Sequence, residues 1–291
     1  MSRRRPPTVH GLAIVDKPAG ITSHDVVGML RRRFGERRVG HAGTLDPSAT
    51  GVLVVGVGNV TRLLRFVGDG TKRYVGEVVL GVETDTLDAD GTVTARHEMT
   101  AVTVEDARRA VDAHLTGDVM QVPPMVSALH VGGRRLHELA RQGIEVERQP
   151  RPVRIDRFAV EPTDEPLVLA IDVECTGGTY VRALAADLGR LLGGGAHLRH
   201  LRRVAVGPYT IDEAAPPDEC QLLPTEAAVR ALATVDVDAN TSADIEHGRV
   251  LAAPEGTGPW AMLDAHGRLL AVYEPYRDGR AKPSVVIPPH G

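Results

Sequence analysis

Between Gly40 and Gly51 the chain reads GHAGTLDPSATG, and the apolar run VLVVGV follows directly. The three glycines let the backbone turn tightly and approach another molecule closely, while Pro47 restricts the orientations open to the Asp46 carboxylate. One alternative is an ordinary strand-to-strand turn in which Asp46 is only a capping residue. Because twelve residues with one acid and one histidine are long for a turn, we predict a functional loop centred on Asp46.

Outward from this loop, apolar runs predict six strands, separated at uneven intervals by helices. The strand-like runs cover residues 11–16, 51–57, 72–80, 153–160, 167–175 and 202–206. The sequence contains no internal repeat and no regular alternation of strand and helix. We therefore predict an α+β fold in which helices flank a mixed, largely antiparallel sheet, rather than a doubly wound sheet.

Three helices have clear boundaries. Thr22 can cap a helix that begins near Ser23, and Thr103 with Asp106 forms a capping box before an apolar helical stripe. A third helix is expected to open at Thr179 and to continue to Leu192, where three glycines stop it.

The C-terminal part has a different character. Prolines interrupt the chain at 216, 217 and 224, and short apolar runs follow at 260–263, 269–273 and 285–287. The turn sequence DAHG joins the first two runs. This pattern predicts a small β-rich domain appended to the main one.

Composition suits a folded protein with a sizeable core, since 42% of the 291 residues are hydrophobic and 25% are charged. No apolar run approaches the roughly 18 residues of a membrane-spanning helix, so we expect a cytoplasmic protein. Cys175 and Cys220 are too few for a disulfide framework or a structural zinc site, and Cys175 fits a buried strand.

The formal net charge of −4 is unfavourable for nucleic-acid binding, but the charge is unevenly distributed. Residues 1–70, 134–157 and 182–203 carry net charges of +6, +3 and +4, whereas residues 211–291 carry −7. The basic segments could form a phosphate-binding face. Arg31, Arg32 and Arg33 are equally compatible with a solvated helix face, and we favour RNA contact for Arg37 and Arg38, beside the Asp46 loop.

Four motifs, in this order, make the chain resemble the bacterial tRNA pseudouridine-55 synthases of the TruB type. They are DKPAGITS from Asp16, the Asp46 loop, QVPPMVSAL from Gln121, and GTYVR from Gly178 with LRR from Leu201. The resemblance implies isomerisation of one uridine in the T arm of tRNA, by cleavage of its N-glycosidic bond and re-formation through carbon. It also implies a catalytic domain over residues 1–221 and a PUA-like domain over 235–291, with tRNA as partner. We expect a monomer without cofactor.

The chemistry gives Asp46 and Arg182 defined tasks. C1′ of the ribose must lose its bond to N1 and gain one to C5, so a carboxylate beside it can act covalently or stabilise positive charge. Asp46 is the candidate, and Arg182 is the candidate partner for a bidentate ion pair that keeps it ionised and oriented. The alternative for Arg182 is a surface position on its helix.

A base that undergoes chemistry must leave its stack, so an aromatic platform is expected beside it. Tyr74 fits this role, and its hydroxyl could take the C5 proton at the end of the reaction. Tyr180 is the second choice, since core packing explains it about as well.

Other substrate contacts follow from the resemblance. His41 is expected to stack into the T loop and displace the target nucleotide, although a histidine in a loop is often only a turn residue. Lys17 and Lys72 are expected to reach phosphates, and the motif that starts at Leu201 places Leu201 and Arg202 among the substrate-binding residues.

The segment 121–149 resembles the RNA-binding thumb of the family, a mobile basic segment that closes over RNA. The chain departs from the family pattern here, because Val126 and His130 stand where tyrosine and lysine are usual. A contact that requires permanent charge at residue 130 is therefore in doubt.

Two metal-like patterns fail in detail. Aligning Gly91 with the glycine of a calcium loop puts Thr86 and His97 at positions that need acids, and His197 and His200 lack a third ligand at matching spacing, so we expect no metal.

Two rival functions are also disfavoured. A pure RNA-binding factor gains nothing from an acid facing phosphates, and an aspartyl-phosphate hydrolase needs magnesium ligands that the loop does not supply.

Overall fold

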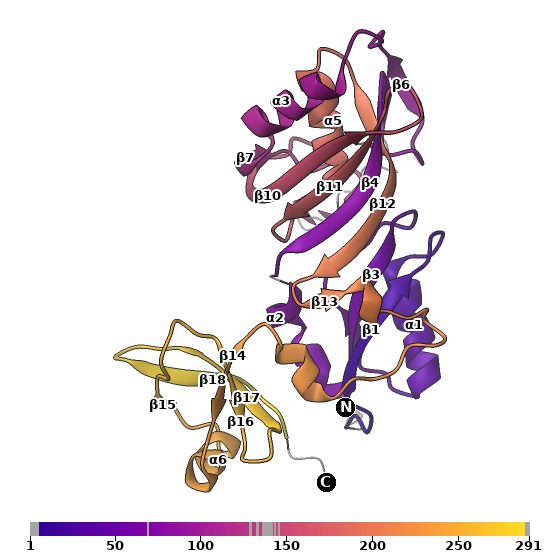
Figure 1. Cartoon of the computed structure of the whole chain (residues 1–291). Coiled ribbons are helices and arrows are strands. Elements are labelled where there is room, and N and C mark those ends of the chain that lie inside the picture. Colours follow the sequence, from indigo (N-terminus) through magenta and orange to yellow (C-terminus); the bar gives the residue numbers. More distant parts are fainter. Residues whose placement is uncertain are drawn as a thin grey trace.

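The computed structural model describes residues 6–68, 70–127, 130–131, 134–135, 142, 144 and 146–288. These residues form a nine-stranded sheet, and the chain then continues into a separate five-stranded sheet near the C-terminus (Figure 1). Two small hairpins complete the strands: β5 (Val82–Thr84) with β6 (Val93–Arg96), and β8 (His130–Val131) with β9 (Arg134–Arg135).

The nine-stranded sheet is mixed and largely antiparallel, which confirms the predicted fold class. Its order is β1 (Gly11–Lys17), β3 (Thr50–Val57), β12 (Ala196–Val206), β4 (Lys72–Leu80), β11 (Val168–Cys175), β10 (Arg151–Pro162) and β7 (Gly117–Gln121), with β2 (Val39–His41) beside β3 and β13 (Tyr209–Thr210) beside β12. Only β3 and β12 pair in parallel. All six predicted strands are present, whereas β2, β7 and β13 were not predicted.

Strand β12 joins the two halves of this sheet. It follows β4 along most of its length but meets β3 only at two register pairs, Arg202 with Thr50 and Arg203 with Gly51. Gly51 has a φ of 100°, and a Cβ there would lie 2.2 Å from the Arg203 carbonyl oxygen. Only glycine fits such a close approach of two backbones, so the end of the Asp46 loop is held against β12.

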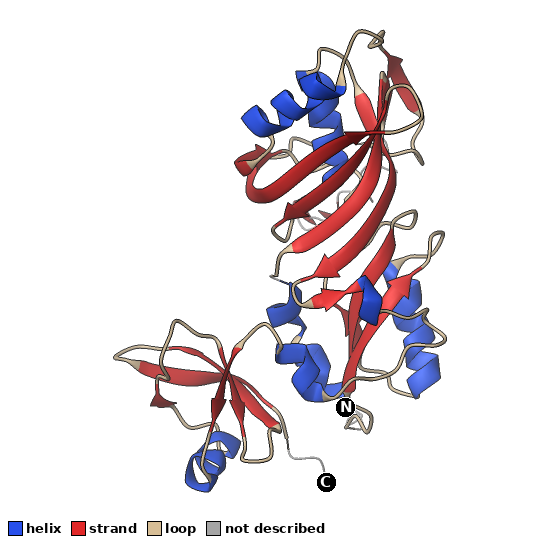
Figure 2. Cartoon of the chain, in the orientation of Figure 1, coloured by secondary structure: helices blue, strands red, loops and turns tan. Residues whose placement is uncertain are grey.

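Two of the three predicted helices start where their caps indicated, and the third starts two residues after the expected Thr179. Helix α1 (Ser23–Phe34) has a capping box between Thr22 and Asp25, and α3 (Val104–His114) has one between Thr103 and Asp106. Helix α5 (Val181–Leu191) follows Tyr180 without a side-chain cap. Helices α3 and α5 lie against one face of the β4–β11–β10–β7 half of the sheet (Figure 2). None of the helices in the described part combines the length and apolarity needed to cross a membrane.

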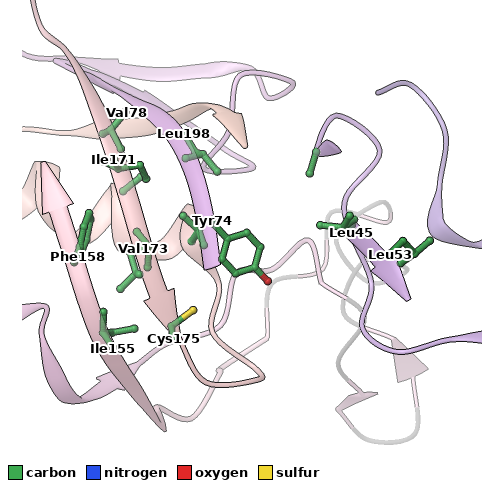
Figure 3. Packing of buried hydrophobic residues seen from close by; sticks show 14 of the residues in the cluster. Leu45, Leu53, Tyr74, Val78, Ile155, Phe158, Ile171, Val173, Cys175 and Leu198 are labelled. Carbon is green, nitrogen blue, oxygen red and sulfur yellow. The ribbon is translucent and has the colours of Figure 1, made fainter. Parts of the chain in front are cut away.

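Four further helical segments of the described residues are short: η1 (Gly58–Arg62), α2 (Leu64–Gly68), η2 (Ile211–Glu213) and η3 (Thr225–Val229). The largest buried cluster lies between the nine-stranded sheet and its helices, and it includes Leu30, Leu53, Val173 and Leu184. Tyr74 belongs to this cluster, and Figure 3 shows its ring between the buried residues of β11 and the side that carries Leu45 and Leu53.

The C-terminal sheet has the order β14 (Ala233–Asp236), β16 (Trp260–Leu263), β17 (Leu269–Pro275), β18 (Arg280–Val286) and β15 (Leu251–Ala252), and α6 (Ala239–Glu246) follows β14 in the chain. The three predicted strands are present, but β14, β15 and α6 were not predicted. Val272 and Ile287 share a buried cluster with Leu63 and Val67, and Arg62 Nη1 donates to the Val286 carbonyl at 2.8 Å. The C-terminal sheet therefore packs on η1 and α2. The proposed domain limits stay a prediction.

Candidate active site

A cavity of about 230 Å³ opens where the Asp46 loop, strands β4 and β12 and the start of α5 meet. Six of the nine residues expected to act on substrate line it: Asp46, Lys72, Tyr74, Tyr180, Arg182 and Leu201. These residues come from four separate parts of the chain. The fold therefore brings together groups that the sequence only suggested as partners.

Asp46 and Arg182 form an ion pair at the cavity wall. Arg182 Nε lies 3.0 Å from Asp46 Oδ2, and the arginine side chain is buried while 40% of the aspartate side chain is exposed. Burial raises the pKa of the Asp46 carboxyl, and the neighbouring Arg182 guanidinium opposes that rise. The carboxylate is thus accessible from the cavity, and its partner is fixed within the protein.

The Arg182 guanidinium is shared among three segments rather than paired bidentately with Asp46. Its Nη1 donates to the Thr86 carbonyl at 2.8 Å and lies 3.2 Å from Asp88 Oδ2, and its Nη2 donates to the Val126 carbonyl at 2.9 Å. This arrangement differs from the expected fork, because a planar guanidinium can satisfy several acceptors at once. Its orientation relative to Asp46 is consequently fixed by contacts on every side.

Asp88 is a residue that the sequence analysis missed. It lies in the segment that superficially resembled a calcium loop, and its Oδ1 accepts a bond from Thr86 Oγ1 at 2.5 Å. Its charge contributes to raising the pKa of Asp46. The turn that follows β5 thus delivers a second carboxylate to Arg182, a contact that sequence distance alone could not indicate.

Two tyrosines line the cavity in different ways. Tyr74 is only 7% exposed, and burial raises the pKa of its phenol while Arg203 opposes the rise. Tyr180 is held through its backbone, since its N–H donates to Gln121 Oε1 at 2.8 Å and its carbonyl accepts from Gln121 Nε2 at 3.1 Å. The side-chain amide of Gln121 thereby fixes the residue that precedes α5.

Lys17 does not have the expected role. Its side chain is fully buried, and its Nζ donates to the carbonyls of Pro18 at 2.8 Å, Ile21 at 2.7 Å and Pro47 at 3.1 Å. Burial lowers the pKa of this ammonium group to about 8. The expected phosphate contact of Lys17 is wrong for this arrangement, because all three donors are used; Lys17 instead anchors the loop next to Asp46.

Two further side chains hold the same loop. Ser23 Oγ accepts from the Leu45 N–H at 2.9 Å and donates to the Leu45 carbonyl at 3.1 Å. Arg203 Nη2 donates to the Gly43 carbonyl at 3.1 Å. Together with Lys17, these contacts fix the backbone before and after Asp46.

His41 and Arg202 lie outside the cavity lining. Burial and the nearby Arg203 lower the pKa of His41, and its buried Nδ1 has no hydrogen-bond partner among the described residues. Arg202 forms a bidentate ion pair with Asp16, at 3.1 Å and 2.7 Å. Because side chains alternate along a strand, Leu201 and Arg203 line the cavity and Arg202 does not. The expected substrate contact of Arg202 stays a prediction outside this cavity, and Arg203, which the sequence analysis did not select, lines it.

Part of the predicted thumb-like segment, residues 121–149, lies outside the described residues, as does the side chain of His130. Within the part that is described, Val126 supplies its carbonyl to Arg182 and Ser127 lines the cavity. The segment therefore begins at the candidate site.

Three family models cover most of the chain. Residues 31–181 match the N-terminal domain of the TruB family pseudouridylate synthases, residues 182–223 the C-terminal domain of tRNA pseudouridylate synthase B, and residues 232–288 the C-terminal part of tRNA pseudouridine synthase II.

Proteins named tRNA pseudouridine synthase B are similar over nearly the full length. The one from Arthrobacter sp. (strain FB24) is 46% identical, covering 96% of this chain and 97% of the relative. The one from Mycobacterium tuberculosis (strain ATCC 25618 / H37Rv) is 43% identical, covering 90% and 91%.

Solved structures show the same fold at low identity. A Cbf5-Nop10-Gar1 complex matches with a TM-score of 0.72 at 22% identity, over 95% of this chain and 84% of that chain. An H/ACA RNP bound to a substrate RNA matches with a TM-score of 0.71 at 21% identity, over 96% and 86%. With the family models and the close relatives, the cavity around Asp46 leads to one conclusion: the chain belongs to the TruB family of pseudouridylate synthases.

Proposed function

We propose that this chain converts a uridine of tRNA into pseudouridine, at position 55 in the T loop. The observation that carries the proposal is the Asp46 carboxylate, open to a cavity and ion-paired with buried Arg182. Relatives that are 43% and 46% identical are named tRNA pseudouridine synthase B, which supports tRNA as the substrate.

The size of the cavity suits a flipped base. Its volume of about 230 Å³ is below the ~300 Å³ at which typical small-molecule pockets begin. Tyr74 and Tyr180 line it and can pack against an extruded uracil, which compensates for the loss of stacking in the RNA. His41 would act outside the cavity, on the loop that the target nucleotide leaves.

The proposed reaction starts at the ribose. The C1′–N1 bond breaks and its electron pair leaves with the uracil, while Asp46 either bonds to C1′ or stabilises its positive charge. The base turns and C5 bonds to C1′, and any bond between Asp46 and C1′ breaks with its electron pair returning to the carboxylate. The C5–H electron pair then becomes the C5–C6 double bond, Tyr74 Oη accepts the proton, and N1 takes a proton from water.

Arg182 keeps Asp46 competent in this reaction. Burial alone would favour the protonated carboxyl, and the guanidinium at 3.0 Å favours the ionised form. Because the net effect raises the pKa of Asp46, we expect activity to fall as the pH drops through that raised value. The isomerisation changes no oxidation state, so we propose that it uses neither a metal nor a redox cofactor.

The protein is proposed to act as a cytoplasmic monomer on the T arm of tRNA, with residues 1–221 as the catalytic domain and 235–291 as a PUA-like domain. Three basic stretches lie in or near the catalytic residues, which supports this division. Lys72 is 8% exposed at the cavity wall, where its charge can meet the phosphate of the flipped nucleotide.

The test is release of tritium from a T-arm stem-loop whose target uridine carries tritium at C5. We expect stoichiometric release, and reverse-transcription stops after carbodiimide treatment should map the product to position 55 in whole tRNA. An Asp156→Asn variant is a matched control, because this acid is ion-paired with Arg154 and does not line the cavity. Binding of the stem-loop without tritium release would reject the proposed activity.

A further inference from the structure

Arg203 is a buried cation that the reaction outlined above does not use. It is 1% exposed and lies on β12 directly opposite Tyr74 on β4 in the strand register. Opposite residues of antiparallel strands project to the same face, with Cβ atoms roughly 5 Å apart. Both side chains line the cavity.

Three hydrogen bonds of its guanidinium go to neutral carbonyl oxygens. Nε donates to Val52 at 2.7 Å, Nη2 to Gly43 at 3.1 Å and Nη1 to Thr44 at 3.4 Å. No carboxylate of the described residues forms an ion pair with this guanidinium, whereas Arg182 has two. A buried charge is costly unless an opposite charge compensates it, so Arg203 is suited to an anion that forms in the cavity.

The group best placed to carry that anion is the Tyr74 hydroxyl. A guanidinium has five N–H groups, and the three carbonyl bonds leave two. The Arg203 side chain interacts with the Tyr74 hydroxyl, and its charge favours the phenolate. As a phenol, Tyr74 is a weak base towards a carbon-bound proton; as a phenolate, it can accept that proton.

Other titratable groups face this pair from each neighbouring element. On the side of Tyr74, Cys175 of β11 and Asp46 both favour the neutral phenol. On the side of Arg203, its charge helps to lower the pKa of Lys17 of β1 and that of His41 of β2. Lys72 of β4 lines the same cavity. Burial and two acidic groups thus oppose ionisation of Tyr74, and Arg203 is the main cation that favours it.

We propose that Arg203 is a positioning residue for the final proton transfer, which stabilises the phenolate form of Tyr74 that accepts the proton of uracil C5. The proposal rests on the function proposed above and assigns a role to a residue outside it. In the balanced step, the C5–H electron pair becomes the C5–C6 double bond, the proton forms the Tyr74 O–H bond, and N1 takes a proton from water. Tyr74 afterwards returns its proton to solvent.

The first experiment needs no RNA. Spectrophotometric titration of tyrosine ionisation, taken as the difference between the wild type and Tyr74→Phe, isolates one of the five tyrosines. Arg203→Met should move this ionisation to higher pH, and Arg203→Lys should move it less. An unchanged titration of Tyr74 in the folded Met variant would overturn the proposal, whether or not the protein modifies tRNA.

The second experiment measures single-turnover rates of tritium release against pH. Arg203→Met should lower the rate near neutral pH by roughly 100-fold, and the loss should shrink as the pH rises. Arg203→Lys should restore part of the rate. Arg199→Met is the matched control, because this arginine lies on the same strand but is ion-paired with Glu77 and Glu165, and we expect little change.

A double-mutant cycle separates this role from support of the Asp46 loop. If Arg203 acts through Tyr74, Arg203→Met should cost less than about 3-fold in a Tyr74→Phe background, because the phenolate is already absent. A purely structural role would give the same loss in both backgrounds and at every pH, and this result would refute the inference. A wild-type protein without any tritium release would instead refute the proposed function.

Discussion

Strand β12 presents arginines with opposite electrostatic surroundings on its two faces. On the outer face, Arg199 is ion-paired with Glu77 and Glu165, and Arg202 with Asp16. On the cavity face, Arg203 is buried against neutral carbonyls and the Tyr74 hydroxyl. Residues of one type on one strand therefore differ in whether a carboxylate compensates their charge.

This difference separates arginines that contribute only to surface stability from an arginine that is suited to take part in the reaction. Exposed ion pairs contribute about 0–1 kcal/mol each and can be replaced with little loss. A buried cation without a carboxylate is costly, and such groups concentrate at functional sites. Arg182 lies between these extremes, because it is buried but shared by Asp46 and Asp88. Substitutions on the two faces should accordingly have very different effects.

The largest effect is expected for Asp46→Asn. The amide preserves the shape of the side chain and loses the charge used at C1′, so turnover should fall by more than roughly 1,000-fold while stem-loop affinity changes only a few-fold. Single-turnover tritium release and a binding titration measure the two quantities. Activity within tenfold of the wild type would exclude the proposed role of Asp46.

The same variant should not be less stable than the wild type near neutral pH. A carboxyl whose pKa is raised in the folded state opposes folding above its unfolded pKa, and this penalty shrinks as the pH falls through the folded value and is gone below the unfolded one. Removing the charge removes the penalty. Thermal denaturation of the two proteins at neutral and acidic pH should show a difference only at the higher pH.

A smaller loss is expected for Arg182→Lys. An ammonium group cannot reach Asp46, Asp88 and the carbonyls of Thr86 and Val126 at the same time, so the carboxylate should be misplaced and turnover should fall about 100-fold. Affinity for the stem-loop should change little. If the loss appeared in affinity alone, Arg182 would have to be reassigned to phosphate binding.

Local sequence signals predicted the framework well. Capping residues marked the starts of α1 and α3, and apolar runs marked the long strands, because these signals depend on neighbours in the chain. Strands β2 and β14 were missed because each is short and depends on a partner strand. The resemblance placed Asp46, Tyr74 and Arg182, which the fold brings to one cavity.

The errors concern contacts that depend on strand register and burial. Lys17 was expected to reach a phosphate, but three backbone carbonyls, those of Pro18, Ile21 and Pro47, surround its ammonium group. Arg203 was not selected, because the motif shows both arginines and only the alternation of β12 and its register with β4 show which one faces the cavity. Asp88 was set aside with a false calcium pattern.

The C-terminal sheet extends the comparison between paired and unpaired cations. Its segment is acidic overall, and Arg230, Arg249 and Arg268 are ion-paired. Arg277 and Lys282 form no ion pair among the described residues and lie 5.2 Å from the ring of exposed Tyr276. We expect these two cations to contribute to binding of whole tRNA, away from the T arm.

Replacing both Arg277 and Lys282 by serine should therefore weaken the binding of whole tRNA by a few-fold. The slope of log affinity against log salt concentration should fall by about 1.4–1.8, at roughly 0.7–0.9 per phosphate contact. Binding of the isolated stem-loop should be unchanged. Arg249→Ser is the paired control. Point substitutions are preferable to removing the tail from about Val235, because Val272 and Ile287 cover Leu63 and Val67. Loss of stem-loop binding in the double variant would mean that the segment with Arg277 and Lys282 is a principal RNA site.

The smallest effect is expected on the outer face of the large sheet, for Asp172→Asn. This carboxylate is bonded to Arg73 at 2.7 Å and Arg157 at 2.5 Å. The Arg73 hydrogen bond, followed by that of Arg157, lowers its pKa.

A lowered pKa gives stability that is present above the unfolded value and lost as the pH falls through the folded one. The variant should therefore lose at most about 1 kcal/mol near neutral pH, and the difference should vanish in acid. Denaturant unfolding at several pH values measures this, and tritium release should stay at the wild-type rate. A clear fall in turnover, or a large change in stem-loop affinity, would mean that RNA reaches the outer face of the sheet. The contrast between the two faces of β12 would then no longer separate residues for stability from residues for catalysis.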